Sequence, residues 1–291
     1  MGGKSPYTPS ELADLFSNFY QFLTTLHYDP AELQHPPTGG WPGLTTRAFG
    51  NWKDKTVVEV LRRLPYFHSK AAIHYKSKLV DYATADLEMI KSDCNDREED
   101  LEFWSSKGKR HRKYIVYLAI GHESGGRELL LNVRDGEIIE DVLETDTLSP
   151  CDVRRYLNKL KLAYRSLKLV PCVGRITIEA EKVPETVKKI TEEEVLAQSA
   201  NWGTDLDVQY VRQLYREHGW PEAFRREDAK AAVDSLMGLV MERRDDEWEM
   251  EDEYWLSEGE AEDWSGEGGS NDEWEDVSMS EEDVRSENDE Q

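Results

Sequence analysis

One Gly-rich run carries the residue types of two catalytic loops. Residues 121–127 read GHESGGR and directly follow an apolar run. A phosphate loop would need Lys and then Ser or Thr where Arg127 and Glu128 stand, with a helix after them. A nucleophile elbow places Gly two residues before its nucleophile, whereas Gly121 lies three residues before Ser124. The spacing therefore predicts a hairpin loop between two strands.

The histidines are the other candidates for chemistry, and their spacing argues against a metal site. The seven histidines are scattered, and none forms the HxH, HExxH or Cys/His pattern that zinc requires. His122 and Glu123 could donate to a ligand, but a solvated loop pair is the simpler interpretation. We expect no metal, no cofactor and no catalytic residue. An enzymatic alternative would depend on the loop residues His122, Glu123, Ser124 and Arg127.

A second cluster is basic. Residues 107–113 read KGKRHRK, and the charges come from Lys107, Lys109, Arg110, Arg112 and Lys113. Such a run could be a solvated loop ahead of a strand, a nuclear import signal or a phosphate-binding patch. We favour the solvated loop.

The last 47 residues make the chain strongly acidic. Residues 245–291 hold 22 of the 60 acidic residues and one base, Arg285. Residues 1–244 keep 38 acidic and 35 basic residues, so their net charge is −3, whereas that of the whole chain is −24. A like-charge segment of this density repels itself and buries too little apolar surface to offset its chain entropy. We therefore predict a disordered acidic tail, and we expect no direct binding to nucleic acid.

Aromatic residues and serines suggest that this tail does more than solubilise. It holds four of the nine tryptophans: Trp248, Trp255, Trp264 and Trp274. Tryptophans spaced through an acidic segment indicate binding to a protein partner, with the acids steering a basic surface. Five serines have an acidic residue three positions later, as acidophilic kinases prefer: Ser257, Ser270, Ser278, Ser280 and Ser286. The tail could also fold back onto residues 107–113 by charge attraction.

The chain has features of an intracellular protein. Cys94, Cys151 and Cys172 are odd in number and far apart, which suits a reducing compartment. No apolar run reaches the roughly 18 residues that span a membrane. The first residues also lack the apolar core of a signal peptide. We expect a cytoplasmic or nuclear protein without membrane contact.

Helical patterns occupy both ends of the body. Apolar residues recur at helical spacing in five segments, residues 9–26, 55–64, 152–167, 206–218 and 226–244. Capping boxes mark Thr8 and Thr191 as helix starts. Trp248 and Trp255 continue the apolar stripe of the last helix, which could therefore extend into the tail.

The centre of the body has the pattern of an antiparallel sheet. Apolar segments 114–120, 128–133 and 138–142 are joined by the Gly-rich run and by a turn at Asp135 and Gly136. They predict a three-stranded meander, and the extended segment 168–180 is a candidate fourth strand.

These elements predict an α+β fold in three parts. A helical N-terminal part and a three- to four-stranded antiparallel meander with a packed helix form a domain at 1–183. A helical extension packed on it occupies 184–244, and the tail occupies 245–291. The sequence leaves open whether residues 1–244 form one domain or two.

Several segments resemble known protein groups. The run YLAIGHESGGRELLLNVRDGEIIED (117–141), followed by a helix, is similar to the SUKH superfamily, which includes fungal cell-wall and signalling regulators and bacterial immunity proteins. FYQFLTTLHYDP (19–30), EVLRRLPYFHSKAAIHYKSKLVDY (59–82) and YREHGWPEAFRRE (215–227) resemble uncharacterised proteins of filamentous fungi. The resemblance implies a non-catalytic α+β binding module that holds protein partners, and it transfers no catalytic residue.

Three functions are compatible with these features. We favour a non-catalytic intracellular interaction or regulatory protein whose tail binds a partner with a basic surface. The tail could instead belong to a nuclear transcriptional co-regulator or a histone-binding protein, with residues 109–112 as the import signal. The third alternative is an accessory enzyme of a fungal biosynthetic pathway. A deep pocket of converging polar groups beside residues 121–127 would favour the enzyme.

Overall fold

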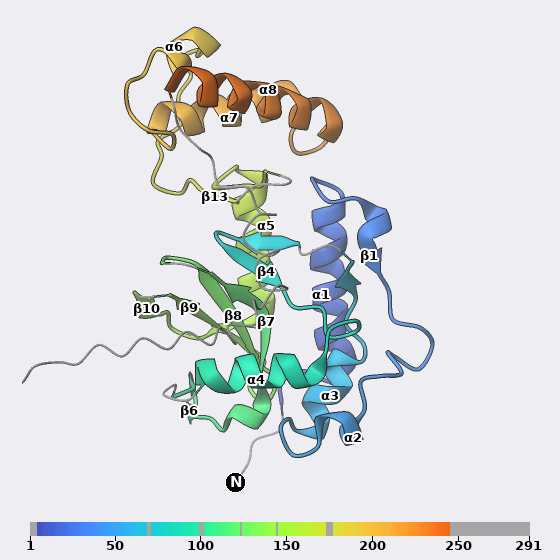
Figure 1. Cartoon of the computed structure of the whole chain (residues 1–291). Coiled ribbons are helices and arrows are strands. Elements are labelled where there is room, and N and C mark those ends of the chain that lie inside the picture. Colours follow the sequence, from blue (N-terminus) through green and yellow to red (C-terminus); the bar gives the residue numbers. More distant parts are fainter. Residues whose placement is uncertain are drawn as a thin grey trace, which may run out of the picture.

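A computed structural model shows an α+β protein, with helices around an antiparallel sheet (Figure 1). The structure describes residues 5–68, 71–98, 102–122, 124–143, 145–172 and 177–244. The predicted α+β fold class is therefore confirmed for this part of the chain. The acidic tail lies outside the described residues.

The main sheet is antiparallel and has the strand order β10-β9-β8-β7-β4-β3, with β11 also paired to β9. Its centre is the predicted meander, formed by β7 (Ile115–Gly121), β8 (Arg127–Asn132) and β9 (Glu137–Val142). Four short strands widen it: β3 (Ala72–His74), β4 (Ser77–Leu79), β10 (Asp146–Thr147) and β11 (Cys151–Asp152). The meander is confirmed, and the β3–β4 hairpin adds a pair of strands that the apolar pattern did not indicate.

Two predicted turns are present. Gly136 closes the β8–β9 turn at a φ of +69°, and an added Cβ there would lie 2.4 Å from the Tyr7 ring. Residues 121–127 join β7 to β8, and a Cβ on Gly126 would lie 2.4 Å from the carbonyl oxygen of His122. Because a strand follows this loop, it is neither a phosphate loop nor a nucleophile elbow.

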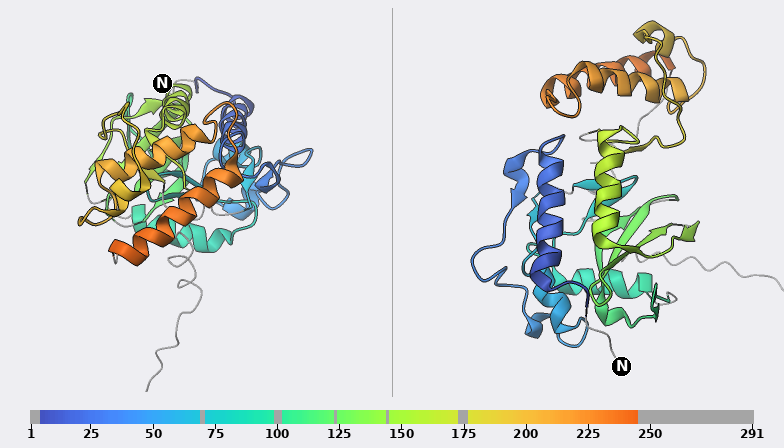
Figure 2. Two further views of the ribbon diagram at one scale, coloured as in Figure 1. Left: turned by 90° about the horizontal axis from the view of Figure 1, so that it is seen from above. Right: turned by 180° about the vertical axis from the view of Figure 1, so that it is seen from behind.

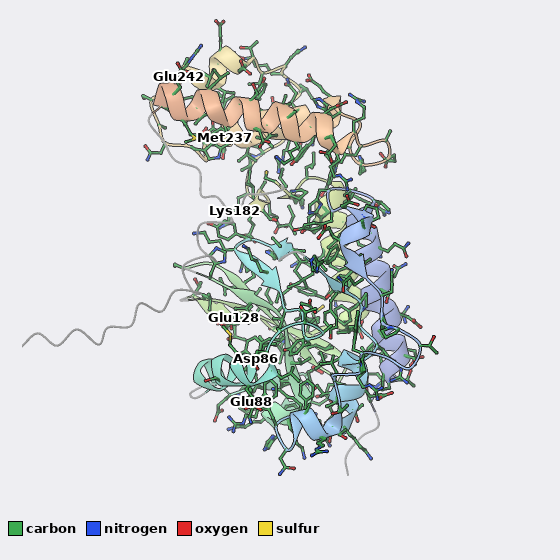
Figure 3. All side chains as sticks on the ribbon, turned by 45° about the vertical axis from the view of Figure 1, so that its right-hand side comes forward. Asp86, Glu88, Glu128, Lys182, Met237 and Glu242 are labelled. Atoms are coloured by element: carbon green, nitrogen blue, oxygen red, sulfur yellow. The ribbon has the colours of Figure 1, made fainter. Side chains whose placement is uncertain are left out.

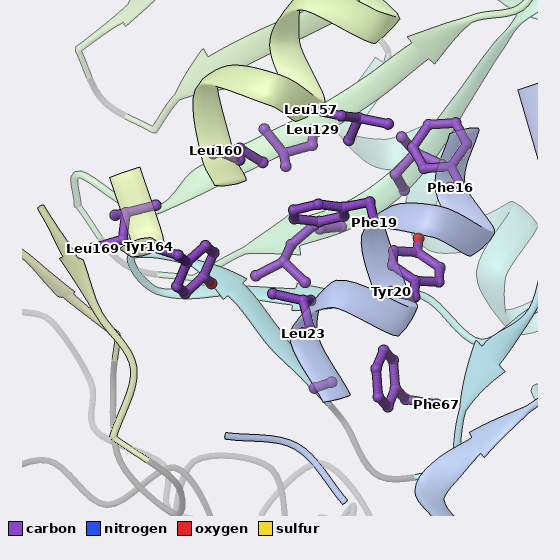
Figure 4. Packing of buried hydrophobic residues seen from close by; sticks show 14 of the residues in the cluster. Phe16, Phe19, Tyr20, Leu23, Phe67, Leu129, Leu157, Leu160, Tyr164 and Leu169 are labelled. Carbon is purple, nitrogen blue, oxygen red and sulfur yellow. The ribbon is translucent and has the colours of Figure 1, made fainter. Parts of the chain in front are cut away.

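Two helices cover one face of the sheet. They are α1 (Pro9–Thr24), which begins at the predicted Thr8 capping box, and α5 (Val153–Arg165). Figure 4 shows the core where they meet the sheet, with Phe19 of α1 and Leu160 of α5 close to Leu129 of β8. All three side chains are buried, and burial of this kind stabilises a fold by about 1.5–3 kcal/mol for each large apolar side chain.

The remaining helices of the first 183 residues lie at the edges of this core. They are α2 (Thr46–Phe49), α3 (Lys55–Leu61), α4 (Leu87–Glu98) and the short 3-10 turns η1 (Pro30–Glu32) and η2 (Arg112–Tyr114). The helix predicted at 55–64 is present as α3, and α4 lies at the end of the molecule opposite to α6–α8 (Figures 1 and 2).

Three small antiparallel sheets accompany the main one. They pair β1 (Leu33–Gln34) with β2 (Tyr66–Phe67), β5 (Trp104–Ser105) with β6 (Gly108–Lys109), and β12 (Leu169–Val170) with β13 (Ile178–Glu179). The described residues of segment 168–180, which are 168–172 and 177–180, therefore do not extend the meander, because their two short strands pair with each other.

The predicted helical extension consists of α6 (Glu192–Leu196), α7 (Asp205–Glu217) and α8 (Arg226–Arg244), and α6 begins at the predicted Thr191 capping box. Buried Arg212 of α7 holds it to the body by donating to the carbonyl oxygens of Leu167, Ala180 and Val183 at 2.9, 2.6 and 2.9 Å. Carbonyl oxygens satisfy a buried guanidinium without a buried carboxylate.

The end of α8 is fixed by an ion pair. Arg244 lies 2.8 Å from Asp207 of α7, and the two side chains are 2% and 0% exposed. Figure 3 shows buried Met237 on the inner side of α8 and exposed Glu242 on its outer side. The body therefore ends in a fixed residue, and the predicted extension of α8 toward Trp255 lies outside the described residues.

Candidate functional site

The candidate site is a hollow beside α5. It has a volume of about 730 Å³, within the range of about 300–1,000 Å³ that is usual for ligand sites. We call it the α5 groove. Figure 2 (right) shows α5 at the surface, between α1 and the strands β8–β10. The side chains that line the α5 groove include those of His74, Arg127, Glu140, Leu148, Asp152, Arg154, Arg155, Tyr156, Lys159, Leu162, Ser166, Lys168, Glu179 and Glu181.

The floor of the α5 groove is a network of ionisable side chains. Glu140 accepts a hydrogen bond from the Tyr156 hydroxyl at 2.9 Å. Its other oxygen lies 3.7 Å from Nε of Arg127 and 3.9 Å from Nε2 of His74. The Arg127 guanidinium also donates to both oxygens of Glu179, at 2.8 and 2.9 Å. We call these five residues the floor network.

Strand geometry brings Arg127 and Glu140 together. Leu129 of β8 is directly opposite Glu140 of β9, and Arg127 lies two residues before Leu129. Alternate residues of a strand share a face, so Arg127 is the diagonal neighbour of Glu140. A carboxylate can therefore occupy an almost fully buried position because a cation stands beside it.

The floor network is not prepared for acid–base chemistry at neutral pH. Burial, and then the charges of Arg127 and Lys159, lower the pKa of His74 to about 3. Its Nδ1 accepts the backbone N–H of Tyr75 at 2.9 Å, so the neutral ring carries its proton on Nε2. Burial and the nearby Glu140 carboxylate raise the pKa of Tyr156. Efficient general acids and bases have pKa values near the working pH.

The rim of the α5 groove is cationic and partly apolar. Arg155, Lys159, Leu162 and Ser166 follow one another at helical spacing along α5. The Leu162 side chain is 65% exposed, and Leu148 across the groove is 38% exposed. Such side chains are suited to holding a segment that is both acidic and apolar.

The cations of this rim have no carboxylate of their own. In the part of the chain that the structure describes, no ion pair involves Arg154, Arg155 or Lys159. The carboxylates of the groove are engaged elsewhere: Glu140 and Glu179 with Arg127, Glu181 with Lys168 at 3.5 Å, and Asp152 with the Tyr7 hydroxyl at 2.7 Å. The lining holds five cations (Arg127, Arg154, Arg155, Lys159 and Lys168) and four carboxylates (Glu140, Asp152, Glu179 and Glu181), so it carries one excess positive charge, and its unpaired cations lie on α5.

The predicted basic run 107–113 lies in a different environment. It belongs to the β5–β6 hairpin and to η2. Arg110 donates to Asp135 at 2.5 and 3.2 Å, Lys107 lies 3.6 Å from Asp135, and Lys109 pairs with Glu102. Burial raises the pKa of Asp135, but hydrogen bonds from Arg110 and Asn132 outweigh it and bring the pKa to about 2. Three of the five bases of this run are therefore paired, and they share two carboxylates, Asp135 and Glu102.

The Gly-rich run contributes one residue to the α5 groove. Arg127 lies in the floor network, whereas Ser124 is exposed in the hairpin loop. His122 donates its backbone N–H to the carbonyl oxygen of Lys76 at 3.1 Å, so this loop packs on the β3–β4 turn. Glu123 lies outside the described residues. Of the three described residues of the enzymatic alternative, His122, Ser124 and Arg127, only Arg127 lines the groove.

The sequence-predicted residues of the tail cannot be placed. The tryptophans and serines concerned lie outside the described residues: Trp248, Trp255, Trp264, Trp274, Ser257, Ser270, Ser278, Ser280 and Ser286. Their roles stay predictions.

The sequence did contain a signal for the rim. Residues 153–165 read VRRYLNKLKLAYR, with five Lys or Arg and no acidic residue. The apolar stripe Val153, Leu157, Leu160 and Tyr164 predicts which side of the helix is buried, so the cations had to lie on the other sides. The floor network could not be found in this way, because it joins strands and a helix from distant parts of the chain.

Comparison of the chain with protein-family models, curated proteins and solved structures found no match. The likeness to filamentous-fungal proteins and to the SUKH superfamily therefore stays a prediction. Within the described residues, no helix is long and apolar enough to cross a membrane. The same residues contain no cluster of three or more His, Cys, Asp or Glu side chains that could hold a metal ion.

Proposed function

We propose that this protein is a non-catalytic interaction protein with two binding surfaces. The α5 groove is the surface on the body, and residues 245–291 are the second. The observation that carries the proposal is the cationic rim of the α5 groove, whose Arg154, Arg155 and Lys159 form no ion pair with a described residue. Beneath this rim the pKa of His74 is lowered to about 3, far from that of a general base at neutral pH, which supports binding rather than turnover.

The rim of the α5 groove defines the kind of partner that it fits. Arg155 and Lys159 would pair with carboxylates, and exposed Leu162 would meet an apolar or aromatic side chain. The matching partner is an acidic peptide segment with interspersed aromatic or aliphatic residues. The tail has the opposite chemistry to that rim, so its external partner would present a basic surface.

The location of the protein in the cell stays a prediction. An intracellular protein in the cytoplasm or nucleus would meet both kinds of partner. The ion pairs of Lys107, Lys109 and Arg110 favour a structural role for residues 107–113 over an import signal.

Selection from a displayed peptide library tests the α5 groove. The full chain and a chain ending at Arg244 would be immobilised, after circular dichroism has shown that both are folded. We expect acidic peptides with aromatic residues to be enriched, and Lys159→Glu to weaken their binding about fivefold. Arg112→Glu is the matched control, because Arg112 is exposed in the run 107–113 and forms no ion pair among the described residues.

Two results would contradict this role of the α5 groove. One is enrichment of basic or purely apolar peptides, and the other is equal binding by wild type and Lys159→Glu. The tail is tested separately with basic peptides, which should bind the full chain and not the chain ending at Arg244.

A further inference from the structure

Helix α5 carries five basic residues and no acidic residue. Besides Arg154, Arg155 and Lys159, these are half-buried Lys161 and exposed Arg165, which lie beside the Phe22 ring of α1. No ion pair with a described residue involves either of them. Burial, and then the charge of Arg165, lower the pKa of Lys161, as expected where cations crowd without anions.

The same chain carries a segment of complementary chemistry. Residues 245–291 hold 22 acidic residues, one base and four tryptophans. Carboxylates match the cations of α5, and indole rings match Leu162, Leu148 and the guanidinium faces of the rim.

The length of the tail permits contact with its own α5 groove. The tail follows Arg244, whose side chain pairs with Asp207. Fully extended, 47 residues span ~160 Å, whereas a body of this size has a radius of gyration of ~18 Å. Attachment to the same chain gives such a segment an effective concentration of the order of millimolar.

We infer that residues 245–291 dock on the α5 groove of the same chain and occupy it until an acidic partner segment displaces them. The inference rests on the proposed function, because it requires the α5 groove to accept acidic aromatic segments. It places the tail on the α5 groove instead of on residues 107–113, because Lys107, Lys109 and Arg110 already pair with Asp135 or Glu102.

Two consequences follow from the charges involved. Added salt screens opposite charges, so it should release the tail. Phosphates on Ser257, Ser270, Ser278, Ser280 or Ser286 would add negative charge and strengthen the docked state. Occupancy of the α5 groove would then depend on the modification of a distant segment.

Carbodiimide cross-linking of the full chain tests the docked state, because it joins carboxylates to lysines in direct contact. At low salt we expect links from tail carboxylates to Lys159 and Lys168 of the groove, and no comparable links to Lys107 or Lys109. Arg155→Gln keeps Lys159 as the reporter and removes a charge one helical turn away without adding a carboxylate that could itself couple to Lys159. It should lower the Lys159 links about threefold, and Arg112→Gln should leave them unchanged.

The Arg155→Gln change should not disturb the helix. Residue 155 lies three positions after the Asp152 cap of α5, where glutamine is compatible with a capping box. The backbone N–H of Arg155 still donates to the Asp152 side chain, as it does in the wild type at 3.1 Å. Equal thermal unfolding of both variants and wild type would confirm this.

Mixing light and isotopically heavy chains separates contact within one chain from contact between two. Links confined to chains of one isotope support the inference. Mixed links show that a second copy occupies the groove, and they overturn it. Links to Lys107 or Lys109 alone, or no tail links at low salt, overturn it as well.

Peptide binding distinguishes this failure from failure of the proposed function. If a selected acidic peptide binds the full chain with the same affinity as the chain ending at Arg244, the tail does not occupy the groove and the proposed function stands. We expect instead about tenfold tighter binding after removal of the tail. If no acidic peptide binds either chain, the proposed function itself is wrong.

Discussion

Residues 107–113 and helix α5 both carry five basic side chains, yet the fold treats them in opposite ways. In the first, the bases are adjacent in sequence, and three of them pair with Asp135 or Glu102. In α5, they are spread over thirteen residues, and no described carboxylate pairs with them. The density of charge along a sequence is therefore a poor measure of the charge that a surface presents.

The cause of this difference is where the turns and strands place their acids. Asp135 lies in the β8–β9 turn, where the Asn132 side chain holds it through a hydrogen bond at 2.8 Å. The β5–β6 hairpin brings Arg110 to that turn. Beside α5, the nearest buried acid is Glu140, and Arg127 and Tyr156 already engage it. In the folded structure, carboxylates lie within ion-pair distance of residues 107–113, whereas no described carboxylate lies within that distance of the α5 bases.

The floor network gives the largest expected effect. Arg127→Met should lower the free energy of unfolding by about 3–5 kcal/mol, because Glu140 and part of Glu179 would remain as buried charges without a cation. Urea unfolding at pH 7 measures the change. Lys168→Met is the control, since it removes a cation from an exposed pair with Glu181 and should cost at most about 1 kcal/mol. Equal losses would mean that the floor network is not a structural unit.

A change at Asp135 should leave residues 107–113 with unpaired cations, as in α5. Asp135→Asn keeps the shape of the side chain and removes the charge that holds Arg110 and Lys107. We expect a loss of about 2 kcal/mol in urea unfolding, since a nearly buried guanidinium loses its ionic partner. The freed cations should also give residues 107–113 an affinity for acidic peptides. Glu102→Gln frees only exposed Lys109 and should cost less than about 1 kcal/mol. Unchanged stability would show that tertiary pairing does not distinguish the regions.

The floor network, which contains His74, and the turn that contains Asp135 should lose stability at different pH values. His74 has a folded-state pKa of about 3 against an ordinary 6.5, so the unfolded chain binds its proton first. Its contribution is complete above pH 6.5 and is lost as the pH falls toward 3. Asp135, with a pKa of about 2 against 3.8, contributes above pH 3.8 and loses this only as the pH falls toward 2.

Urea unfolding at pH 7.5 and pH 5.0 measures this separation. Between these values His74 should cost the wild type about 2 kcal/mol, and Asp135 should cost almost nothing. His74→Gln should remove that part of the loss. Buried His27, whose pKa is also lowered to about 3, by burial and by Arg226, would remain in the variant as a second source of acid sensitivity. An identical loss in wild type and variant would exclude His74 as a buried neutral base.

Much of the fold was predictable because its signals are local. The caps at Thr8 and Thr191, the Asp135–Gly136 turn and the alternating meander all depend on neighbouring residues, and the structure contains them. The β3–β4 hairpin escaped because its strands have three residues each and lack an alternating pattern. The low apolar content of α4 likewise hides a helix that buries Ile90 and Cys94.

The candidate site was predictable only in part. The sequence of α5 shows a buried stripe and therefore implies a polar surface opposite to it. Nothing local reveals that Glu140 meets His74 and Arg127, since these three residues come from different strands and their pairing is tertiary. Whether a cation is free or neutralised depends on such pairing, so residues 107–113 and α5 could not be ranked from the sequence.

The smallest expected effect concerns the apolar part of the comparison. Both basic regions have an exposed apolar neighbour: Leu162 on α5 and Trp104 beside residues 107–113, at 65% and 54% exposure. Leu162→Ala should change the free energy of unfolding by less than about 0.5 kcal/mol, because the side chain is largely solvated already. It should nevertheless weaken binding of a selected aromatic acidic peptide to the chain ending at Arg244 about threefold. Trp104→Ala should leave that affinity unchanged. An exposed apolar side chain contributes to peptide binding only where neighbouring unpaired cations bind the peptide's carboxylates. Fluorescence anisotropy of a labelled peptide measures both, and an equal loss in the two variants would show that charge pairing does not select the binding surface.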